Sequence, residues 1–357
     1  DEPLLTRAEL RAIEAAEALR ERGLKPDRLH LLHARFAMGD RLAIERRVRE
    51  TLGKSGAAEA RRGFVVVGTQ ILQESLDYDV DVMVADLAPV DLIIQRAGRL
   101  WRHDERTRDG RPVETPELVV VAPNWEKVDD HAWYHQVSPR AAAVYKHHGV
   151  VWRTAKVLAE ATQIVTPGDA SSRGGVRALI EAAYARHDQD NKDVPEPLQK
   201  ASNEAVGKHM AVAAQANANL LDIREGYAGN NTLWTADTVT PTRLGELVTV
   251  FRLGRIVGGV VVPWCTAEDG DPLRSWALSE VSLSQRKAGG VPALDAATER
   301  LIQRAKDTWP EWEREQPLLL LSGDPEAASG TILDGKGKEH RVAYGRTTLG
   351  LRIVTPA

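Results

Sequence analysis

Cysteine is almost absent from this sequence. The 357 residues include one cysteine, Cys265. A single thiol excludes an internal disulfide framework and a thiolate metal site, because each needs several cysteines. Cys265 is therefore expected to be a small, buried, apolar side chain.

Long apolar runs and a strong charge of one sign are also missing. No run approaches the roughly 20 apolar residues that a helix needs to span a bilayer, and no secretory signal segment is recognisable. These absences predict a cytoplasmic protein that does not contact a membrane. The net charge of −4 excludes a strongly basic chromatin-type binder, whereas a nucleic-acid channel needs only local cations.

A phosphate-cradling loop is the most informative absence. The pattern G-x-x-x-x-G-K-[ST] does not occur. Gly53-Lys54-Ser55 matches only its end, because Val48 stands where the first glycine belongs. No acidic Walker B run follows a buried strand. The chain begins at Asp1 rather than methionine, and we expect it to be part of a longer protein.

The histidines do not predict a metal site. His131 and His135 are four residues apart, but Ala132 stands where a zinc protease needs glutamate. The dipeptides His103-Asp104 and His187-Asp188 lack the further ligands of a nuclease centre. Tryptophans are expected to pack in the core rather than to stack on bases; they are Trp133, Trp152, Trp234, Trp264 and Trp276.

Apolar periodicity predicts an α/β fold. Short apolar strands are expected at 29–33, 64–68, 80–87 and 118–121, with helices at 6–22, 41–51 and from Pro89 to about Leu100. Alternation of this kind predicts a doubly wound parallel sheet over 1–125. Residues 126–235 are expected to form a helical linker region, and 236–357 a smaller α+β domain with strands near 247–251, 255–262, 317–321, 340–344 and 348–354.

Polar and cationic residues follow two of these strands. Thr69 and Gln70 come directly after the strand 64–68, at the kind of strand end where α/β sheets bind ligands. Arg99 and Arg102 are three residues apart at the expected end of a helix, so they are expected to point the same way. Guanidinium groups grip phosphate oxygens, although a lone arginine pair more often caps a helix end.

These segments together resemble superfamily 2 helicases. Residues 69–77 are similar to motif V of that superfamily and residues 95–102 to motif VI. The longer string QESLDYDVDVMVADLAPVDLIIQRAGRLWRH resembles the helicase–nuclease of type I CRISPR interference. Leu31–Phe36 with Asp40-Arg41 is similar to its motif IV region, and Thr242–Glu246 to the opening of its C-terminal domain.

The resemblance implies a role for each matched residue. Gln95 and Asp77 would face ATP, with Asp77 near the ribose, and Arg96, grouped with them, would brace the motifs against each other. Arg99 and Arg102 would act as arginine fingers on the γ-phosphate. The residues near the DNA backbone would be His33, Arg35, Thr69 and Gln70.

The resemblance also implies a larger machine. This chain would be the C-terminal part, with a second RecA-like lobe, a linker and an accessory domain. ATP with Mg²⁺ would bind between this lobe and a first RecA-like lobe, and nuclease metal ions would lie in an N-terminal domain. The expected partners are single-stranded DNA and an RNA-guided surveillance complex with its R-loop. The chain alone is expected to be inactive. The alternatives are another superfamily 2 helicase, or a non-catalytic module that binds DNA or the surveillance complex.

Overall fold

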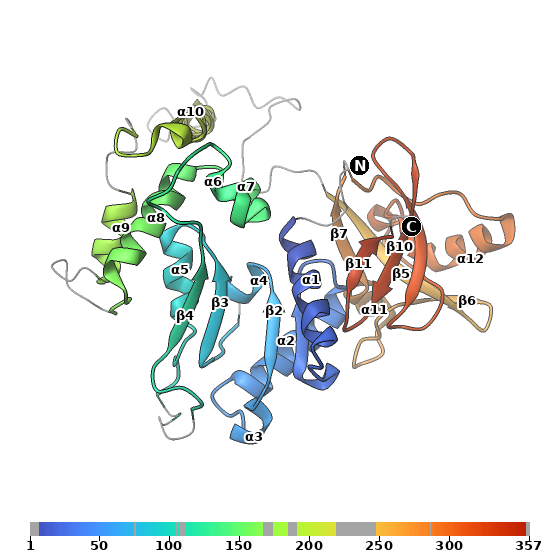
Figure 1. Cartoon of the computed structure of the whole chain (residues 1–357). Helices are drawn as coiled ribbons and strands as arrows, with labels where there is room; N and C mark the ends of the chain where they lie inside the picture. Colours follow the sequence, from blue (N-terminus) through green and yellow to red (C-terminus); the bar gives the residue numbers. More distant parts are fainter. Residues whose placement is uncertain are drawn as a thin grey trace, which may run out of the picture. The chain divides into compact units, whose positions relative to one another are not determined.

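The computed structural model describes residues 7–74, 76–104, 106, 111–166, 174–184, 191–218, 248–285 and 287–354 (Figure 1). The chain divides into two compact units. Unit 1 combines residues 1–79, 103–110 and 246–357, and unit 2 combines residues 80–102 and 111–245. Each unit has its own hydrophobic core.

A parallel pair of short strands organises the N-terminal part of unit 1. Strands β1 and β2 run in register, from Leu29 opposite Val65 to Leu32 opposite Gly68. A parallel pair needs a long crossover connection, which α2 and α3 supply, and α1 packs against both strands. The elements are α1 (Arg7–Glu21), β1 (Leu29–Leu32), α2 (Met38–Leu52), α3 (Ala58–Arg61), β2 (Val65–Gly68) and α4 (Ile71–Glu74).

The C-terminal part of unit 1 is built from two sheets. Strand β5 pairs with β6 and β7 in the antiparallel sense and with β8 in the parallel sense, while β9, β10 and β11 form an antiparallel sheet. Gly258 and Gly259 have positive φ, which suits the tight turn between β5 and β6. The elements are β5 (Val248–Val257), β6 (Val260–Pro263), α11 (Pro272–Leu278), β7 (Glu280–Ser284), α12 (Ala296–Lys306), β8 (Leu318–Leu320), β9 (Ala328–Leu333), β10 (Glu339–Gly345) and β11 (Gly350–Ile353).

The two parts of unit 1 share one core. Ala37, at the start of α2, is fully buried in the cluster that contains Phe251, Leu253, Ile332 and Tyr344. Helix α11 also contacts α2. The segment that follows β1 is therefore packed directly against the C-terminal sheets.

Unit 2 combines a second parallel pair with a group of helices. Strands β3 and β4 run from Val82 opposite Glu117 to Asp86 opposite Val121. Leu87, Tyr134, Val151 and Leu198 lie in its main core. The elements are β3 (Val82–Asp86), α5 (Val90–Ala97), β4 (Glu117–Val121), α6 (Trp133–Val137), α7 (Pro139–Val144), α8 (His148–Ala161), α9 (Val176–Tyr184) and α10 (Glu196–Ala218).

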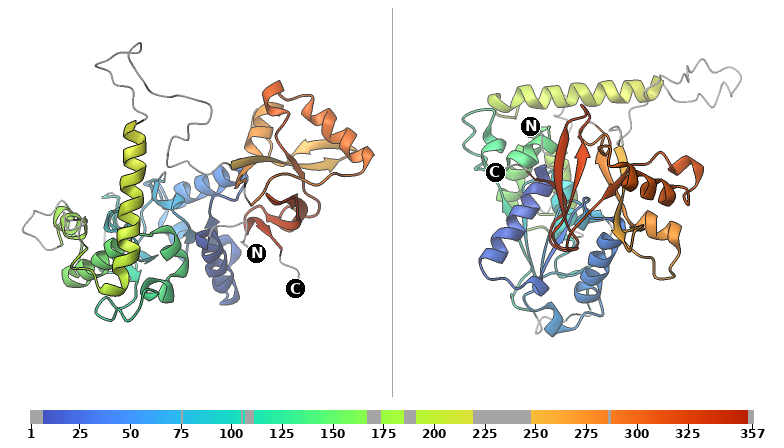
Figure 2. Two further views of the ribbon diagram at one scale, coloured as in Figure 1. Left: turned by 90° about the horizontal axis from the view of Figure 1, so that it is seen from above. Right: turned by 90° about the vertical axis from the view of Figure 1, so that its right-hand side faces the viewer.

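Helix α10 is one long rod (Figure 2). Its first turns are anchored, because Leu198 is buried and Ser202 Oγ accepts the Gly149 N–H at 2.8 Å. Farther along, Met210 and Val212 are exposed. No helix in the described part of the chain is long and apolar enough to cross a membrane.

The observed elements follow the expected order, and the molecule is mixed α/β. All four strands expected within 1–125 are present, but the helix that begins after Pro89 ends at Ala97 rather than near Leu100. The described strands of this region pair only as β1–β2 and β3–β4, so one doubly wound sheet stays a prediction, as do the bounds of the three domains. Thr242–Glu246, His187-Asp188 and Trp234 lie outside the described residues.

Candidate functional site

The strand ends of β1 and β2 bring residues expected near DNA to one sheet edge. His33 follows β1, and Thr69 follows β2, whose last residue Gly68 pairs with Leu32. The Thr69 N–H donates to Leu32 O at 3.2 Å. Position 68 requires glycine, because a Cβ there would lie 2.7 Å from Leu32 O. Thr69 is half-buried and Gln70 exposed, so these two can reach a ligand at this edge.

His33 is turned into the protein. Its side chain is fully buried, Nε2 lies 3.0 Å from Leu349 O, and Nδ1 accepts the Arg35 N–H at 3.1 Å. These partners assign the proton to Nε2. Burial lowers the pKa of His33 from 6.5 to about 4, so the ring is neutral at pH 7. The geometry favours a role in holding the Leu349 segment beneath the edge over direct contact with phosphate.

Arg35 is engaged within unit 1 as well. Its Nε lies 3.1 Å from Glu9 Oε2, and both side chains are largely buried. Its Nη1 donates to the Ser282 carbonyl, and its own carbonyl accepts the Leu351 N–H at 2.8 Å. Arg35 thus cross-links α1, the loop after β1 and the C-terminal sheets.

Asp77 is an exposed residue between the buried residues Leu76 and Tyr78, and a buried histidine contacts its carboxylate. His103 Nε2 is 3.2 Å from Asp77 Oδ1, and the Asp77 side chain is 55% exposed. The carboxylate therefore faces solvent and can accept a hydrogen bond from a ligand hydroxyl. The sequence alone marks His103 only as half of a His-Asp dipeptide and does not predict this contact.

The arginine segment follows the end of α5 in unit 2. Main-chain bonds fix it to Val80: the Val80 N–H donates to Arg99 O at 3.0 Å, and the Trp101 N–H donates to Val80 O at 3.1 Å. Trp101 has a φ of 46°, so Arg99 and Arg102 do not lie on one helix and the helical-spacing argument does not apply to them. Arg102 is exposed, with Nη1 3.2 Å from Gly98 O.

The two remaining candidates lie on α5 itself. Gln95 is exposed, so its amide can reach a ligand. Arg96 Nη1 donates to Asp86 O at 2.7 Å, at the end of β3. This bond fastens α5 to the strand that precedes it, which is a bracing contact.

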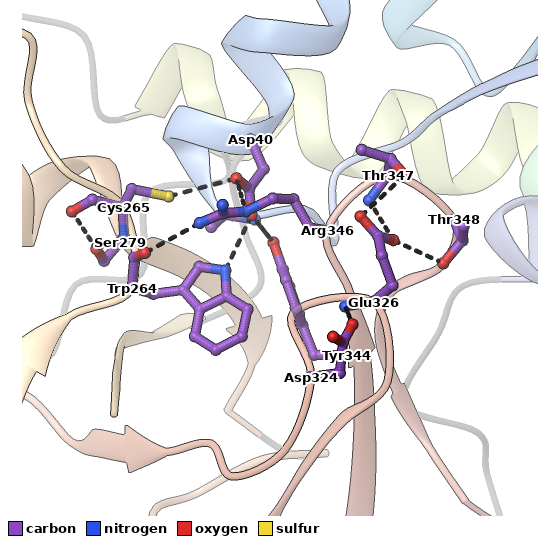
Figure 3. Close-up of polar contacts among 11 residues, drawn as sticks. Asp40, Trp264, Cys265, Ser279, Asp324, Glu326, Tyr344, Arg346, Thr347 and Thr348 are labelled. Carbon is purple, nitrogen blue, oxygen red and sulfur yellow. Dashed lines mark hydrogen bonds and ion pairs between the residues drawn. The ribbon is translucent and has the colours of Figure 1, made fainter. Parts of the chain in front are cut away.

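A buried carboxylate, Asp40, was not assigned a role from the sequence. Figure 3 shows the donors that converge on it. Trp264 Nε1 donates to Oδ2 at 3.0 Å and the Tyr344 hydroxyl to the same oxygen at 2.7 Å. Arg346 Nε lies 3.0 Å from Oδ1 as an ion pair, although its N–H is not aligned for a hydrogen bond.

Burial and the Asp40 charge raise the pKa values of two residues next to Asp40. Burial raises the pKa of Cys265 to about 12, with the Asp40 charge adding to the effect, and burial raises the pKa of Tyr344 well above its usual value. Both groups therefore stay protonated at pH 7. Asp40 shares the buried face of α2 with Ile44 and Val48. A carboxylate on an apolar helix face was the sequence signal for this site.

No metal site accompanies these residues. Among the described residues, no group of three or more His, Cys, Asp or Glu side chains could hold a metal ion. Trp133, Trp152, Trp264 and Trp276 are buried, as expected for core tryptophans.

Comparison with known proteins gives these residues a family context. Residues 9–105 match the family model described as CRISPR-associated nuclease/helicase Cas3, C-terminal. The chain is 33% identical over 132 residues to the CRISPR-associated endonuclease/helicase Cas3 of Escherichia coli, covering 37% of this chain and 13% of that protein. It is 30% identical over 178 residues to the Cas3 of Thermus thermophilus, covering 49% and 17%.

The fold is also shared with solved structures. The crystal structure of T. fusca Cas3-ATP aligns with a TM-score of 0.64 at 22% identity, over 96% of this chain and 37% of that chain. A chain from a structure described as a CRISPR RNA-guided surveillance complex, pre-nicking, aligns with a TM-score of 0.62 at 23% identity, over 98% of this chain and 40% of that chain.

Residues 9–105 are therefore similar to the C-terminal region of CRISPR-associated nuclease/helicases. Among these, the chain is related in sequence to Cas3. The aligned region spans less than a fifth of the length of the curated relatives named above.

Proposed function

We propose that this chain is the C-terminal part of an ATP-dependent single-stranded DNA translocase and nuclease of type I CRISPR interference. One observation carries most of the proposal. The matched residues 9–105 include every residue predicted to face nucleotide or DNA. In the proposal, β1–β4 belong to one RecA-like lobe, and a first lobe and the nuclease are supplied by other parts of the protein.

The nucleotide role is assigned to two groups of residues. Arg99 and Arg102 reach the γ-phosphate, where always-charged guanidinium groups stabilise the charge that develops during transfer. Main-chain bonds to Val80 support this assignment, because they fix the backbone that carries Arg99. Gln95 and Asp77 contact the nucleotide, and Arg96 acts by fastening α5 to β3. ATP is the nucleotide expected, because the T. fusca relative was solved with ATP.

The DNA role is assigned to the edge of the β1–β2 pair. Thr69 and Gln70 carry hydroxyl and amide groups that bond phosphate and sugar without reading sequence. Their position after a parallel strand supports this role. We assign His33 and Arg35 an indirect role, since their side chains support the edge through Leu349, Glu9 and Ser282.

The surveillance complex is the proposed partner. A relative with the same fold was solved in a structure described as an RNA-guided surveillance complex. The single strand displaced by a guide RNA would be the DNA that this lobe grips. Mg²⁺, when bound with ATP, would neutralise phosphate charge.

The DNA assignment can be tested with the intact natural protein, including any segment that precedes Asp1. ATP hydrolysis would be measured as a function of single-stranded DNA concentration for the wild type, the double variant Thr69→Ala, Gln70→Ala, and the control Arg177→Ala. Arg177 is an exposed residue paired with Glu181 on α9.

We expect single-stranded DNA to stimulate hydrolysis in the wild type and in the control. The double variant should need about tenfold more DNA for half-maximal stimulation, because each lost hydrogen bond contributes roughly 0.5–1.5 kcal/mol. Its rate without DNA should be unchanged. Wild-type DNA dependence in the double variant would refute the assigned edge, and a wild-type protein without DNA-stimulated hydrolysis would refute the proposed function.

A further inference from the structure

His103 connects two aspartates of one loop within unit 1. Its ring is buried, with Nε2 3.2 Å from Asp77 Oδ1. Its backbone N–H donates to Asp79 Oδ2 at 2.9 Å. The same histidine is therefore fixed through its main chain by Asp79 and bonds Asp77 through its side chain.

Asp79 is a rigid support for this contact. Its side chain is fully buried, and Oδ1 accepts from Arg106 Nη1 at 3.2 Å. Its N–H donates to Leu52 O at 2.9 Å at the end of α2, and its carbonyl accepts from Arg61 Nη1 at 3.1 Å. Through Asp79, the His103 backbone is therefore fixed to the end of α2.

The bonding pattern assigns the tautomer of His103. A carboxylate only accepts, so the proton lies on Nε2. Nδ1 is buried and has no hydrogen-bond partner among the described residues.

The Asp77 carboxylate is held in place and still faces solvent. Its side chain is 55% exposed, while that of His103 is 3% exposed. A buried donor restricts the rotamers of an exposed acceptor, and an acceptor fixed in advance loses less entropy when a ligand binds. This combination suits a ligand contact better than an interior structural bond, which would bury both partners.

We propose that His103 is a positioning residue for nucleotide binding, which holds the Asp77 carboxylate to accept a hydrogen bond from a ribose hydroxyl. The inference rests on the proposed function, in which Asp77 faces the nucleotide. His103, the residue that this inference adds to the proposed nucleotide site, directly follows Arg102 in the sequence. The segment that carries the proposed arginine fingers therefore ends on the residue that holds the proposed ribose contact.

The test compares ribose discrimination among variants of the intact natural protein. The ratio of kcat/KM for ATP to that for 2′-deoxy-ATP and 3′-deoxy-ATP would be measured with single-stranded DNA present. The variants are Asp77→Ala, His103→Gln, His103→Asn and His103→Phe. Glutamine places an amide N–H near the position of Nε2, asparagine is too short to do so, and phenylalanine keeps the ring volume without a donor.

We expect the wild type to prefer ATP over at least one deoxy analogue by about tenfold, which corresponds to ~1.4 kcal/mol. Asp77→Ala, His103→Asn and His103→Phe should lose most of this preference, mainly through KM for ATP, and His103→Gln should keep it. A purely structural role would lower the melting temperature and leave the preference intact.

Four results would overturn the proposal. Unchanged preference in His103→Asn and His103→Phe would mean that the histidine does not position Asp77, and equal loss in His103→Gln would mean that the donor is irrelevant. Unchanged preference in Asp77→Ala would remove the ribose contact while leaving the proposed function intact. A wild-type protein without ATP hydrolysis would overturn both.

Discussion

Replacing Asp40 with alanine removes an acceptor that buried donors share in the core of unit 1. Trp264 Nε1 and the Tyr344 hydroxyl would both lose their partner (Figure 3). Each orphaned buried donor costs about 1–3 kcal/mol. Arg346 is 38% exposed, so water can solvate its guanidinium and its contribution is small. We expect the two orphaned donors together to cost about 2–6 kcal/mol.

The assay is urea unfolding of this chain, followed by tryptophan fluorescence and circular dichroism. The control is Glu268→Ala, which removes an exposed ion pair with Arg46, a residue of the same helix as Asp40. Exposed pairs contribute about 0–1 kcal/mol. A loss below about 1 kcal/mol for Asp40→Ala, equal to that of the control, would refute the reasoning that Asp40 joins α2 to the C-terminal sheets.

Three further predictions concern the pH dependence of stability, two glycine substitutions and ATP hydrolysis by this chain. Burial lowers the pKa of His33 from 6.5 to about 4, so the unfolded state binds a proton at a higher pH than the folded state does. The free energy of unfolding should therefore fall by up to about 3 kcal/mol as the pH falls from 6.5 to 4. Unfolding curves at pH 7.5 and 4.5 should show a smaller loss for His33→Gln than for the wild type. Gly350→Ala should destabilise unit 1 by roughly 1–3 kcal/mol, because φ is +65° and a Cβ would lie 2.8 Å from His33 Cε1. The control Gly207→Ala lies on helix α10, where a Cβ would meet nothing within 4 Å, and it should stabilise the chain by about 0.5–1 kcal/mol. Equal effects of the two substitutions on the free energy of unfolding would refute the argument. The purified chain should show no ATP hydrolysis with or without single-stranded DNA, and steady turnover would refute the argument that half of the ATP site lies elsewhere.

Local pattern predicted the strands and the order of the fold well. Apolar runs predicted β1, β2 and β4, although β2 is only half-buried and Val119 of β4 is exposed. Strand β5 was expected to break near Gly254, yet it runs from Val248 to Val257. The glycine marks close packing there, since a Cβ would lie 3.3 Å from Trp276 and Leu318. Strand β9 was missed because Ser329 and Gly330 interrupt its apolar pattern.

The polar contacts of the site were less predictable because they join distant residues. Asp40 is 224 positions from Trp264 and 304 from Tyr344, and no local pattern encodes such a pairing. His33 was expected near DNA because of its motif, but its environment is set by Leu349, 316 positions away. The contact between His103 and Asp77 was not predicted, because the two residues lie 26 positions apart.

We propose that Arg99 completes an ATP site supplied in part by another region of the protein. The most direct test compares Arg99→Ala with wild type in the intact natural protein, measuring ATP hydrolysis and single-stranded DNA affinity in the same preparation. We predict a loss of hydrolysis of about 10³-fold or more with DNA affinity nearly unchanged. Hydrolysis at the wild-type rate in Arg99→Ala would contradict the account.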